Sequence, residues 1–323
     1  MYVTVGTFNL NNLFSRYNFR GEIQAIRASE TDVETDVHYE FGDADTYKIR
    51  TYMGRLVNEK DEEDTRTIAD RIIDIDVDVL AVQEVEDIDT LKQFNRDYLN
   101  RMYRYTGLIE GNDPRLIDVG ILSKYPIGGM TSWRHAVHPD DAATPVFGRD
   151  LHEVEIYSHT RSRKLFTIFN NHLKSHFVDF RENEEEGERD NTARRTRQAE
   201  MIAEIVKYRT RPRSAYIILG DMNDPPDSAA LSAFVNDPNL KLVDGLANPQ
   251  ETRPPKADTP PPDTTAWTHR YKPTGLPAEY ELYDQIWLSP NLAQKQTEAW
   301  IDRRTLHGGD GSDHDPAWVE LRL

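Results

Sequence analysis

Polar side chains that can bind metal ions or phosphate recur where short apolar segments of this sequence begin or end. These residues are Asn9, Glu84, His172, Asp221, Asn223, Asp284, Asp313 and His314. Carboxylate and carboxamide oxygens are ligands that a hard dication accepts, and histidine is the side chain that exchanges a proton near neutral pH. Strand ends that open onto one rim are a common place for the sites of α/β folds. We therefore expect these side chains to meet in one site.

Each position taken alone has a plainer interpretation. An Asn or Asp at a strand end is most often a turn former, Glu84 suits a solvated loop, and a single histidine such as His172 more often makes a structural hydrogen bond. The joint pattern favours function, because carboxylates, carboxamides and two histidines recur at strand ends along the whole chain.

The segments that must position these side chains alternate between β-rich apolar runs and helical patterns. Helices are predicted over residues 65–75 and 191–208, where apolar residues recur at helical spacing. Strands, most of them buried on both sides, are predicted over residues 3–8, 79–82, 119–122, 151–157, 165–169, 216–219, 285–288 and 317–321.

Three stretches interrupt this alternation. Residues 21–64 are strongly acidic and indicate a surface insertion, residues 182–197 change from acidic to basic, and residues 254–262 are proline-rich and predict an extended loop. The sequence has no internal repeat and no convincing linker. We therefore expect a single domain over residues 1–323.

The composition limits the chemistry that is available. With 323 residues and 37% hydrophobic content, the chain can bury a large core. It has no cysteine, so disulfides, zinc-thiolate sites and cysteine nucleophiles are excluded and any metal needs oxygen or imidazole ligands. No apolar run approaches the roughly 20 residues of a membrane helix, and no secretion signal precedes the first predicted strand. The sequence as written predicts a soluble, cytoplasmic protein, with secretion of a processed form left open.

The net charge of −17 bears on the substrate. It repels polyphosphate chains at long range, which argues against a nonspecific duplex binder that works by counterion release. Nuclease chemistry is still allowed, because a local basic patch and bound metal ions can outweigh the overall field.

Six segments, in this order, resemble those of the endonuclease/exonuclease/phosphatase superfamily, whose fold is that of deoxyribonuclease I. Each is weak alone, but the ordered set spans residues 7–316 and is specific. The resemblance implies a four-layer α/β sandwich, with two mixed β-sheets packed face to face, helices outside them and the site at one rim. The segments are Thr7-Phe8-Asn9-Leu10-Asn11, Val82-Gln83-Glu84-Val85, Asn171-His172-Leu173-Lys174-Ser175, Leu219-Gly220-Asp221-Met222-Asn223-Asp224, Tyr283-Asp284-Gln285-Ile286 and Gly311-Ser312-Asp313-His314-Asp315-Pro316.

The resemblance also implies a metal site. Glu84 matches the principal Mg²⁺ ligand of the family, and Asn9 and Asp313 match positions that complete or surround the site. Mn²⁺ and Ca²⁺ are alternatives to Mg²⁺.

The matched histidine at the end of the chain is expected to be the general base. His314 would take a proton from water, and Asp284 would hold its ring in the right tautomer. Asp221 and Asn223 would position the water or contact the phosphoryl oxygens, and Asp221 is the alternative base.

His172 is a further catalytic candidate, and three other positions are assigned to substrate binding. His172 resembles a histidine that binds phosphate or protonates the leaving oxygen in the deoxyribonuclease, sphingomyelinase and inositol phosphatase branches. Arg149 resembles a phosphate-contacting arginine, with a surface salt bridge as its alternative. Arg115 and Asp118 belong to a loop and strand entry that faces substrate in many members.

Two other groups were weighed as substrate contacts. The Arg194-Arg195-x-Arg197 cluster suits a nucleic-acid backbone, but a solvated helix face is the preferred interpretation. Trp267, Tyr271 and Tyr283 suit stacking on a base or lipid, but core packing is the default for these residue types.

The predicted activity is metal-dependent hydrolysis of a phosphodiester by in-line attack of an activated water. Nucleic acid, DNA or RNA, is the expected substrate, because the segment around His172 looks most like that of bacterial extracellular-type nucleases. The alternatives are a phosphatase or phosphodiesterase for inositol, lipid or other small phosphate esters, and a catalytically silent binding module. No protein partner can be deduced.

Overall fold

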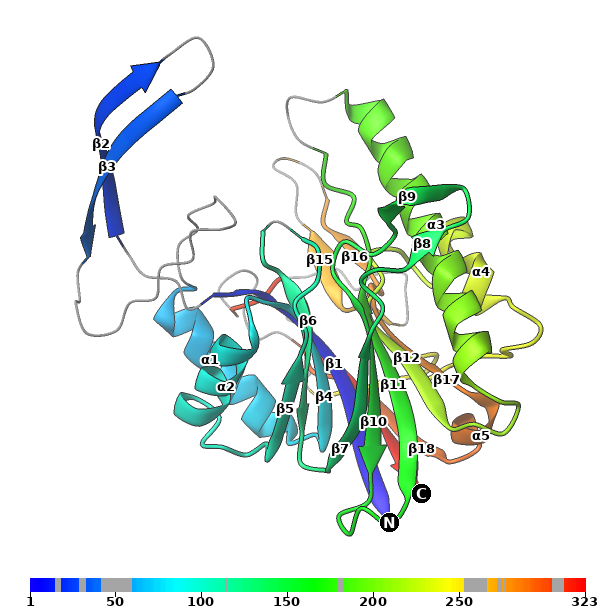
Figure 1. Ribbon diagram of the computed structural model, residues 1–323. Helices are drawn as coiled ribbons and strands as arrows, with labels where there is room; N and C mark the ends of the chain where they lie inside the picture. The colour runs from blue at the N-terminus through cyan, green and yellow to red at the C-terminus, as the bar shows by residue number, and fades with distance from the viewer. Residues whose placement is uncertain are drawn as a thin grey trace.

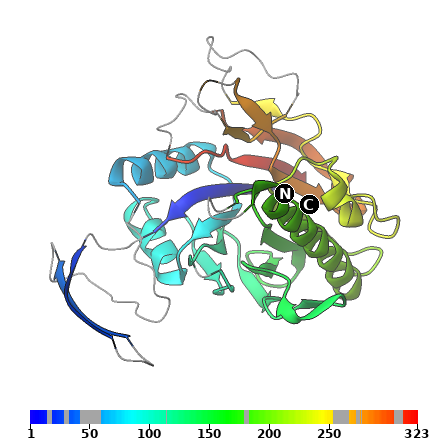
Figure 2. The same cartoon turned by 90° about the horizontal axis from the view of Figure 1, so that it is seen from above.

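Two β-sheets face each other across an apolar layer, with helices on their outer faces (Figures 1 and 2). The computed structural model describes residues 1–14, 60–113, 115–178, 183–252, 266–271, 275, 277–303 and 311–323, together with the backbone of β2 (Phe19–Ala28) and β3 (Val33–Phe41). This arrangement confirms the predicted four-layer α/β sandwich.

The first sheet has seven strands. Its two central strands, β1 and β4, are parallel, and β6 and β19 flank them in the antiparallel direction. In order across the sheet, the strands are β14 (Gln250–Glu251), β18 (Gln296–Ile301), β19 (Ala317–Arg322), β1 (Tyr2–Leu13), β4 (Val79–Val85), β6 (Asp118–Ser123) and β5 (Tyr105–Leu108).

The second sheet has six strands and repeats the same plan. Its parallel pair is β11 and β12, flanked by antiparallel β10 and β17. In order, the strands are β13 (Val243–Asp244), β17 (Asp284–Leu288), β12 (Tyr216–Asp221), β11 (Lys164–His172), β10 (Leu151–Tyr157) and β7 (Ile127–Ser132).

Each parallel pair is joined through a helix, as parallel neighbours require. The connection from β1 to β4 includes α1 (Glu62–Ile75), and the connection from β11 to β12 includes α3 (Glu184–Arg209). The carboxyl ends of the paired strands therefore meet at one edge of each sheet. The antiparallel neighbours β6, β17 and β19 begin at that same edge. This topology brings segments from the whole chain to one rim.

Apolar side chains fill three layers. Val5, Ile168 and Ile217 belong to the layer between the sheets. A second layer lies under α1 and α2 (Ile88–Asp97), and a third under α3 and α4 (Ser232–Val235). Burial of this apolar surface is the main favourable contribution to folding.

Polar side chains cross the central layer near the rim. Gln83 on β4 donates from Nε2 to Asn170 Oδ1 on β11 (2.8 Å) and accepts from Thr7 Oγ1 (3.3 Å). Asn170 in turn donates from Nδ2 to the Gly120 carbonyl (2.8 Å). Buried polar groups are costly unless they are paired, so this network favours one relative placement of the two sheets.

The predicted strands are confirmed, and several are longer than predicted. The sequence patterns missed α2, β5, β7 and β18. The remaining short elements are η1 (Ala229–Leu231), α5 (Pro290–Ala293), β8 (Val137–His138), β9 (Asp141–Pro145), β15 (His269–Tyr271) and β16 (Glu279–Glu281).

The two predicted helices also exist, but the interruption predicted over residues 182–197 is wrong. That stretch supplies the first half of α3, which begins at Glu184. Asn183 caps the helix by accepting from the Glu186 amide, and three glutamates in the first turn favour the positive end of the helix dipole.

The other two irregular stretches are only partly described. The 21–64 stretch contains most of the β2–β3 pair, which Figure 1 draws beside the sandwich, and the start of α1. Residues 42–59 and 254–262 lie outside the described residues. In the described part of the chain, no helix combines the length and apolar character needed to span a bilayer.

One glycine at the rim is required by its surroundings. Gly220 has a φ of +130°, and a Cβ atom there would lie 1.9 Å from the Asn171 carbonyl oxygen.

We expect Gly220→Ala to destabilise the fold by about 3 kcal/mol or more, since the costs of backbone strain and of overpacking add. Thermal unfolding of the purified variants measures this. Gly129→Ala, whose Cβ would meet only the Glu155 side chain, is the control, and equal melting temperatures for the two variants would contradict the prediction.

Candidate active site

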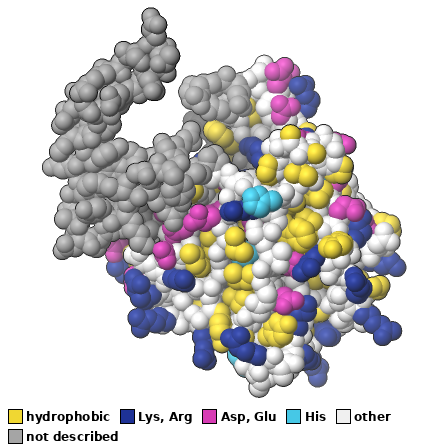
Figure 3. All heavy atoms as spheres, in the orientation of Figure 1, with side chains coloured by type: hydrophobic (Ala, Val, Ile, Leu, Met, Phe, Trp, Pro, Cys, Tyr) yellow, Lys and Arg dark blue, Asp and Glu magenta, His cyan; other side chains and the backbone are white. Residues whose placement is uncertain are grey.

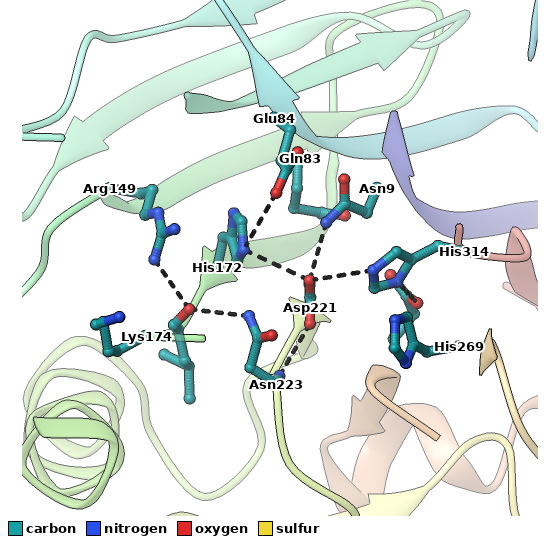
Figure 4. A network of polar contacts seen from close by, with 12 residues as sticks. Asn9, Gln83, Glu84, Arg149, His172, Lys174, Asp221, Asn223, His269 and His314 are labelled. Carbon is teal, nitrogen blue, oxygen red and sulfur yellow. Dashed lines mark hydrogen bonds and ion pairs between the residues drawn. The ribbon is translucent and has the colours of Figure 1, made fainter. Parts of the chain in front are cut away.

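The predicted residues come together at the rim, from both sheets and from the loop before β19 (Figure 4). Asn9 and Glu84 come from the parallel pair of the first sheet, and His172 and Asp221 from that of the second. The ends of the two pairs face each other, which explains why residues so distant in sequence share one site.

Asp221 is the centre of this group. Its carboxylate is buried; Oδ2 accepts from Asn9 Nδ2 (2.9 Å) and Oδ1 accepts from the Asn223 amide (2.9 Å). Asp221 Oδ2 also lies 3.4 Å from His172 Nε2 and 3.8 Å from His314 Nε2. Burial raises the pKa of the Asp221 carboxyl.

His314 is paired with Asp284 on its other nitrogen. His314 Nδ1 lies 2.6 Å from Asp284 Oδ2, and both residues are buried. Burial acts to lower the pKa of His314, but the carboxylates of Asp284, Asp221 and Asp313 outweigh it and raise that pKa to about 10. The Asp284 contact fixes which ring nitrogen faces the carboxylate and leaves Nε2 facing the site.

His172 is electrostatically the opposite of His314. Burial, with Arg149 as the next cause, holds the pKa of His172 well below its usual value, so the ring is neutral. Its Nε2 lies toward Asp221 and is 3.9 Å from Glu84 Oε1, whereas its buried Nδ1 has no hydrogen-bond partner among the described residues. The pKa values of the two site histidines are therefore shifted in opposite directions because their neighbours differ.

Glu84 occupies a strained position. Its φ is +60°, and Asn11 and Asn12 opposite it are also in the left-handed region. The Asn12 amide donates to Glu84 Oε2 (3.0 Å). Such conformations cost about 1–3 kcal/mol each and gather at functional sites. Here the left-handed backbone conformation directs the carboxylate of Glu84 into the rim.

The oxygen donors at this end of the rim fit a hard dication. Burial raises the pKa of Glu84, and the nearby Asp313 and Asp221 carboxylates raise it further. Asn9 Oδ1 accepts from the Asn11 amide (2.9 Å) and retains a second lone pair. Like charges held together in this way favour a cation among them, and carboxylate and carboxamide oxygens are what Mg²⁺ and similar ions accept.

The family model for the endonuclease/exonuclease/phosphatase family matches residues 6–314. The chain belongs to this family. Its members act on phosphate esters, so the chain is a hydrolase of that class, and the family generally uses divalent metals. Comparison with curated proteins found no match.

Solved structures of family members share the fold at low sequence identity. A family protein from Bacteroides vulgatus has a TM-score of 0.60 at 14% identity, with 100% of this chain and 99% of that chain covered. An AP endonuclease from Archaeoglobus fulgidus has a TM-score of 0.59 at 15% identity, with 99% and 100% covered. A mannosyl-6-phosphatase from Bacteroides thetaiotaomicron has a TM-score of 0.57 at 15% identity, also with 99% and 100% covered.

Arg149 lies on the side of His172 away from His314 (Figure 4). Arg149 is buried; its Nη1 donates to the Leu173 carbonyl (3.1 Å), and its Nε lies 3.1 Å from Asp113 Oδ2. The salt bridge considered for Arg149 therefore exists, but it is not on the surface. Arg115 is partly buried and pairs with the same Asp113 through Nε and Nη2.

The preferred interpretation of the arginine cluster on α3 is wrong for Arg195, which is buried. Arg195 Nε donates to Asp224 Oδ2 (2.8 Å), and its Nη1 donates to the Lys174 carbonyl (3.0 Å). Its side chain fastens the helix to the loop after β11. Arg194 and Arg197 remain partly exposed.

The three aromatic residues considered as substrate contacts differ in their burial. Trp267 is buried, as expected, but Tyr271 is exposed and does not belong to the core. Tyr283 makes stacked contacts with His269 and with His176, whose ring centroids are 5.0 and 6.0 Å away. His269 and His176 were not predicted as site residues, because neither stands at the end of a clear apolar strand.

Lys60 is a further rim residue that the sequence patterns missed. Its Nζ donates to the Asn11 carbonyl (2.6 Å), and burial lowers its pKa while Asp64, Asp313 and Glu84 act to raise it. It precedes α1 rather than a strand.

Asp118 is buried and accepts a hydrogen bond from the Gly111 amide through Oδ1 (2.8 Å). Burial raises its pKa from 3.8 to about 7. Between these two pKa values the folded protein keeps a proton that the unfolded chain has lost, so the stability of the fold falls as the pH rises.

Asp118→Asn keeps the hydrogen-bond acceptor but cannot ionise. We therefore expect the stability of this variant relative to wild type to increase from about pH 4 to about pH 7.

Thermal unfolding at several pH values in that window tests this. Asp140→Asn, which changes an exposed aspartate, is the matched control. A difference between Asp118→Asn and wild type that is the same at every pH would show that Asp118 ionises normally in the folded protein.

Proposed function

We propose that this chain is a metal-dependent phosphodiesterase that hydrolyses DNA or RNA by in-line attack of water. The observation that carries the hydrolytic assignment is the row of contacts from His172 through Asp221 and His314 to Asp284. It sets a neutral imidazole and a carboxylate-paired imidazole on either side of one buried carboxylate. A phosphoryl group at this rim meets hydrogen-bond donors on one side and a proton acceptor on the other.

His314 is assigned as general base. A cation bound near Asp313 and Asp221 would oppose the carboxylates that raise the pKa of His314, so that the ring is neutral before reaction. Nδ1 faces Asp284, so Nε2 would then accept the proton of the attacking water, and the Asp284 carboxylate would stabilise the imidazolium that results. Asp221 is the alternative base, because its Oδ2 lies 3.8 Å from the same nitrogen. Asn223 supports Asp221 through its amide and is itself held by Nδ2 donation to the Leu173 carbonyl (3.0 Å).

His172 is assigned to binding the phosphoryl group. A neutral ring whose pKa is held well below its usual value donates a hydrogen bond more readily than it gives up a proton. The lowered pKa of His172 thus supports phosphate binding over protonation of the leaving oxygen, which were the two roles expected for this residue.

Mg²⁺ is the proposed cofactor, with Glu84, Asn9 and Asp313 as the residues that would hold it. When bound, a dication supplies positive charge that stabilises the negative charge developing on the phosphoryl oxygens. It would also relieve the repulsion among the Glu84, Asp313 and Asp221 carboxylates.

A cationic group beside His172 supports nucleic acid as the substrate. Several positive side chains lie close together there. Burial and the neighbouring arginines lower the pKa of Lys174 to about 8. Neighbouring phosphates of a polynucleotide would lie against this group while one phosphodiester occupies the catalytic row. Its members are Arg115, Arg149, Lys174 and Arg194, whereas Arg195 adds positive charge from a buried position where it is paired with Asp224.

A second candidate is hydrolysis of a small phosphate ester, including inositol or lipid phosphates. The net charge of −17 favours it, because a long polyanion is repelled. On the face shown in Figure 3, Lys and Arg side chains are scattered among acidic and apolar ones rather than gathered in one stripe. The AP endonuclease and the mannosyl-6-phosphatase noted above fit this fold equally well.

Substitution of the catalytic row tests the hydrolytic assignment. We expect His314→Ala and Glu84→Gln each to lower the rate on bis-p-nitrophenyl phosphate by about two to four orders of magnitude, because one removes the proton acceptor and the other a metal ligand. His135→Ala, an exposed histidine away from the row, is the control. Circular dichroism verifies folding, and near-wild-type turnover by either folded variant would overturn the assignment.

The substrate class is tested with Arg194→Ala. We expect the KM for single-stranded DNA to rise several-fold at low salt while the KM for bis-p-nitrophenyl phosphate stays constant, because only the polymer reaches the cationic group. Arg163→Ala, an exposed arginine in the turn between β10 and β11, is the matched control.

The same assay compares plasmid DNA, RNA, inositol phosphates and sphingomyelin, with Mg²⁺, Mn²⁺ or EDTA. EDTA-sensitive cleavage of nucleic acid supports the first candidate. Hydrolysis of small or lipid phosphates alone would replace it with the second.

A further inference from the structure

Three potential metal ligands meet beside the oxygen-donor end of the rim. The ligand atoms of His269, Asp313 and His314 all lie within 4.8 Å of one another. His269 Nε2 is 3.8 Å from Asp313 Oδ2, and His314 Nε2 is 3.9 Å from Asp313 Oδ1. This group differs in chemistry from Glu84 and Asn9, because two of its three donors are imidazole nitrogens.

The fold holds His269 in place. Its backbone pairs with that of His314 in an isolated antiparallel bridge, and the next backbone bond runs from the Asp315 amide to the Thr268 carbonyl (2.7 Å). The His269 ring stacks on Tyr283 with an interplanar angle of 17°. Figure 4 shows the ring beside that of His314, and the two ring centroids are 4.9 Å apart.

His314 has the outer partner that metal-binding histidines usually have. Asp284 pairs with Nδ1 of His314, so the ring nitrogen that lies on the Asp313 side is Nε2. A carboxylate behind a ligating imidazole fixes the ring orientation and strengthens the ligand. The Asp284–His314 pair therefore suits metal binding as well as proton transfer.

The donor set favours a zinc-like ion over Mg²⁺. Imidazole suits Zn²⁺ and its transition-metal neighbours, whereas Mg²⁺ prefers oxygen, and two histidines with one carboxylate leave a fourth position for water. A tetrahedral ion with bonds of about 2.0 Å holds its ligands about 3.3 Å apart. The Asp313 carboxylate, whose side chain is 52% exposed, must approach each histidine by roughly half an ångström. The two histidine nitrogens, which lie within 4.8 Å of each other, must also move closer together.

We propose that His269, Asp313 and His314 bind a Zn²⁺-class ion at a site separate from the oxygen ligands Glu84 and Asn9, and that this ion inhibits hydrolysis. The inhibitory part rests on the proposed function. The ion takes the Nε2 lone pair of His314, so His314 no longer accepts the proton of water. It also engages Asp313, which the proposed Mg²⁺ site uses.

The binding part is tested with Co²⁺, a spectroscopic substitute for Zn²⁺, added to the metal-free full-length chain. We expect wild type and Glu84→Gln to develop the visible absorption of low-coordinate Co²⁺, and ZnCl₂ to displace it. His269→Ala should weaken binding by at least about tenfold, since even the loss of an outer partner costs that much. His269→Asn provides a second variant if His269→Ala does not fold.

His176→Ala is the matched control, because His176 also stacks on Tyr283 but is outside the proposed ligand set. It should bind Co²⁺ as wild type does. Equal binding by the folded His269 variants and wild type, or an octahedral spectrum in wild type, would overturn the proposed site.

The inhibitory part is read from hydrolysis of bis-p-nitrophenyl phosphate at fixed Mg²⁺ with increasing ZnCl₂. Each variant is normalised to its own rate without zinc. The zinc concentration for half-inhibition should rise by at least about tenfold in His269→Ala and stay at the wild-type value in His176→Ala. Unchanged inhibition in His269→Ala would overturn the inhibitory role, whereas an inactive wild type that still binds Co²⁺ would count against the proposed function alone.

Discussion

The buried contacts of the Asp221 carboxylate are the interaction on which the rest of the site depends. One oxygen meets Asn9 from the first sheet and faces a histidine on either side, so the two sheets and the loop before β19 all converge on it. A buried carboxylate is expensive unless it is hydrogen-bonded or paired. The positions of Asn9, His172 and His314 therefore offset the cost of burying Asp221 and form the proposed catalytic arrangement at the same time.

This convergence is possible because each sheet has a parallel pair at its centre. The ends of β1, β4, β11 and β12 open onto one rim, and their antiparallel neighbours begin there. The Gln83–Asn170 hydrogen bond then keeps one sheet in register with the other just below the site. Gly220 lets β12 approach β11 closely enough for Asp221 to pair with His172 in the ladder.

Much of the fold and of the site was predictable from the sequence, and the residues that were not predicted were missed for physical reasons. Apolar strands that end in carboxylates, carboxamides or histidines are visible as patterns, so the eight rim residues and the sandwich were expected. His269 and Lys60 were not, because the structure brings them to the rim through tertiary contacts rather than as the ends of apolar strands. Arg195 was misread because charge alone does not reveal that Asp224 buries it. The start of α3 was missed because its acidic first turn resembles a loop.

Charge is distributed across the site in a way that the net value of −17 conceals. Carboxylates of Glu84, Asp313 and Asp221 occupy one side, and the cationic group around Lys174 occupies the other. Burial lowers the pKa of both histidines, and the two sides act on them in opposite directions, which explains why the pKa of His314 is raised and that of His172 is lowered. A phosphodiester bound between these two groups would face the cationic group around Lys174 on one side. On the other side, a bound cation would have to neutralise the carboxylates. The folded arrangement of charges thus supports the proposed metal, as do the ligand types.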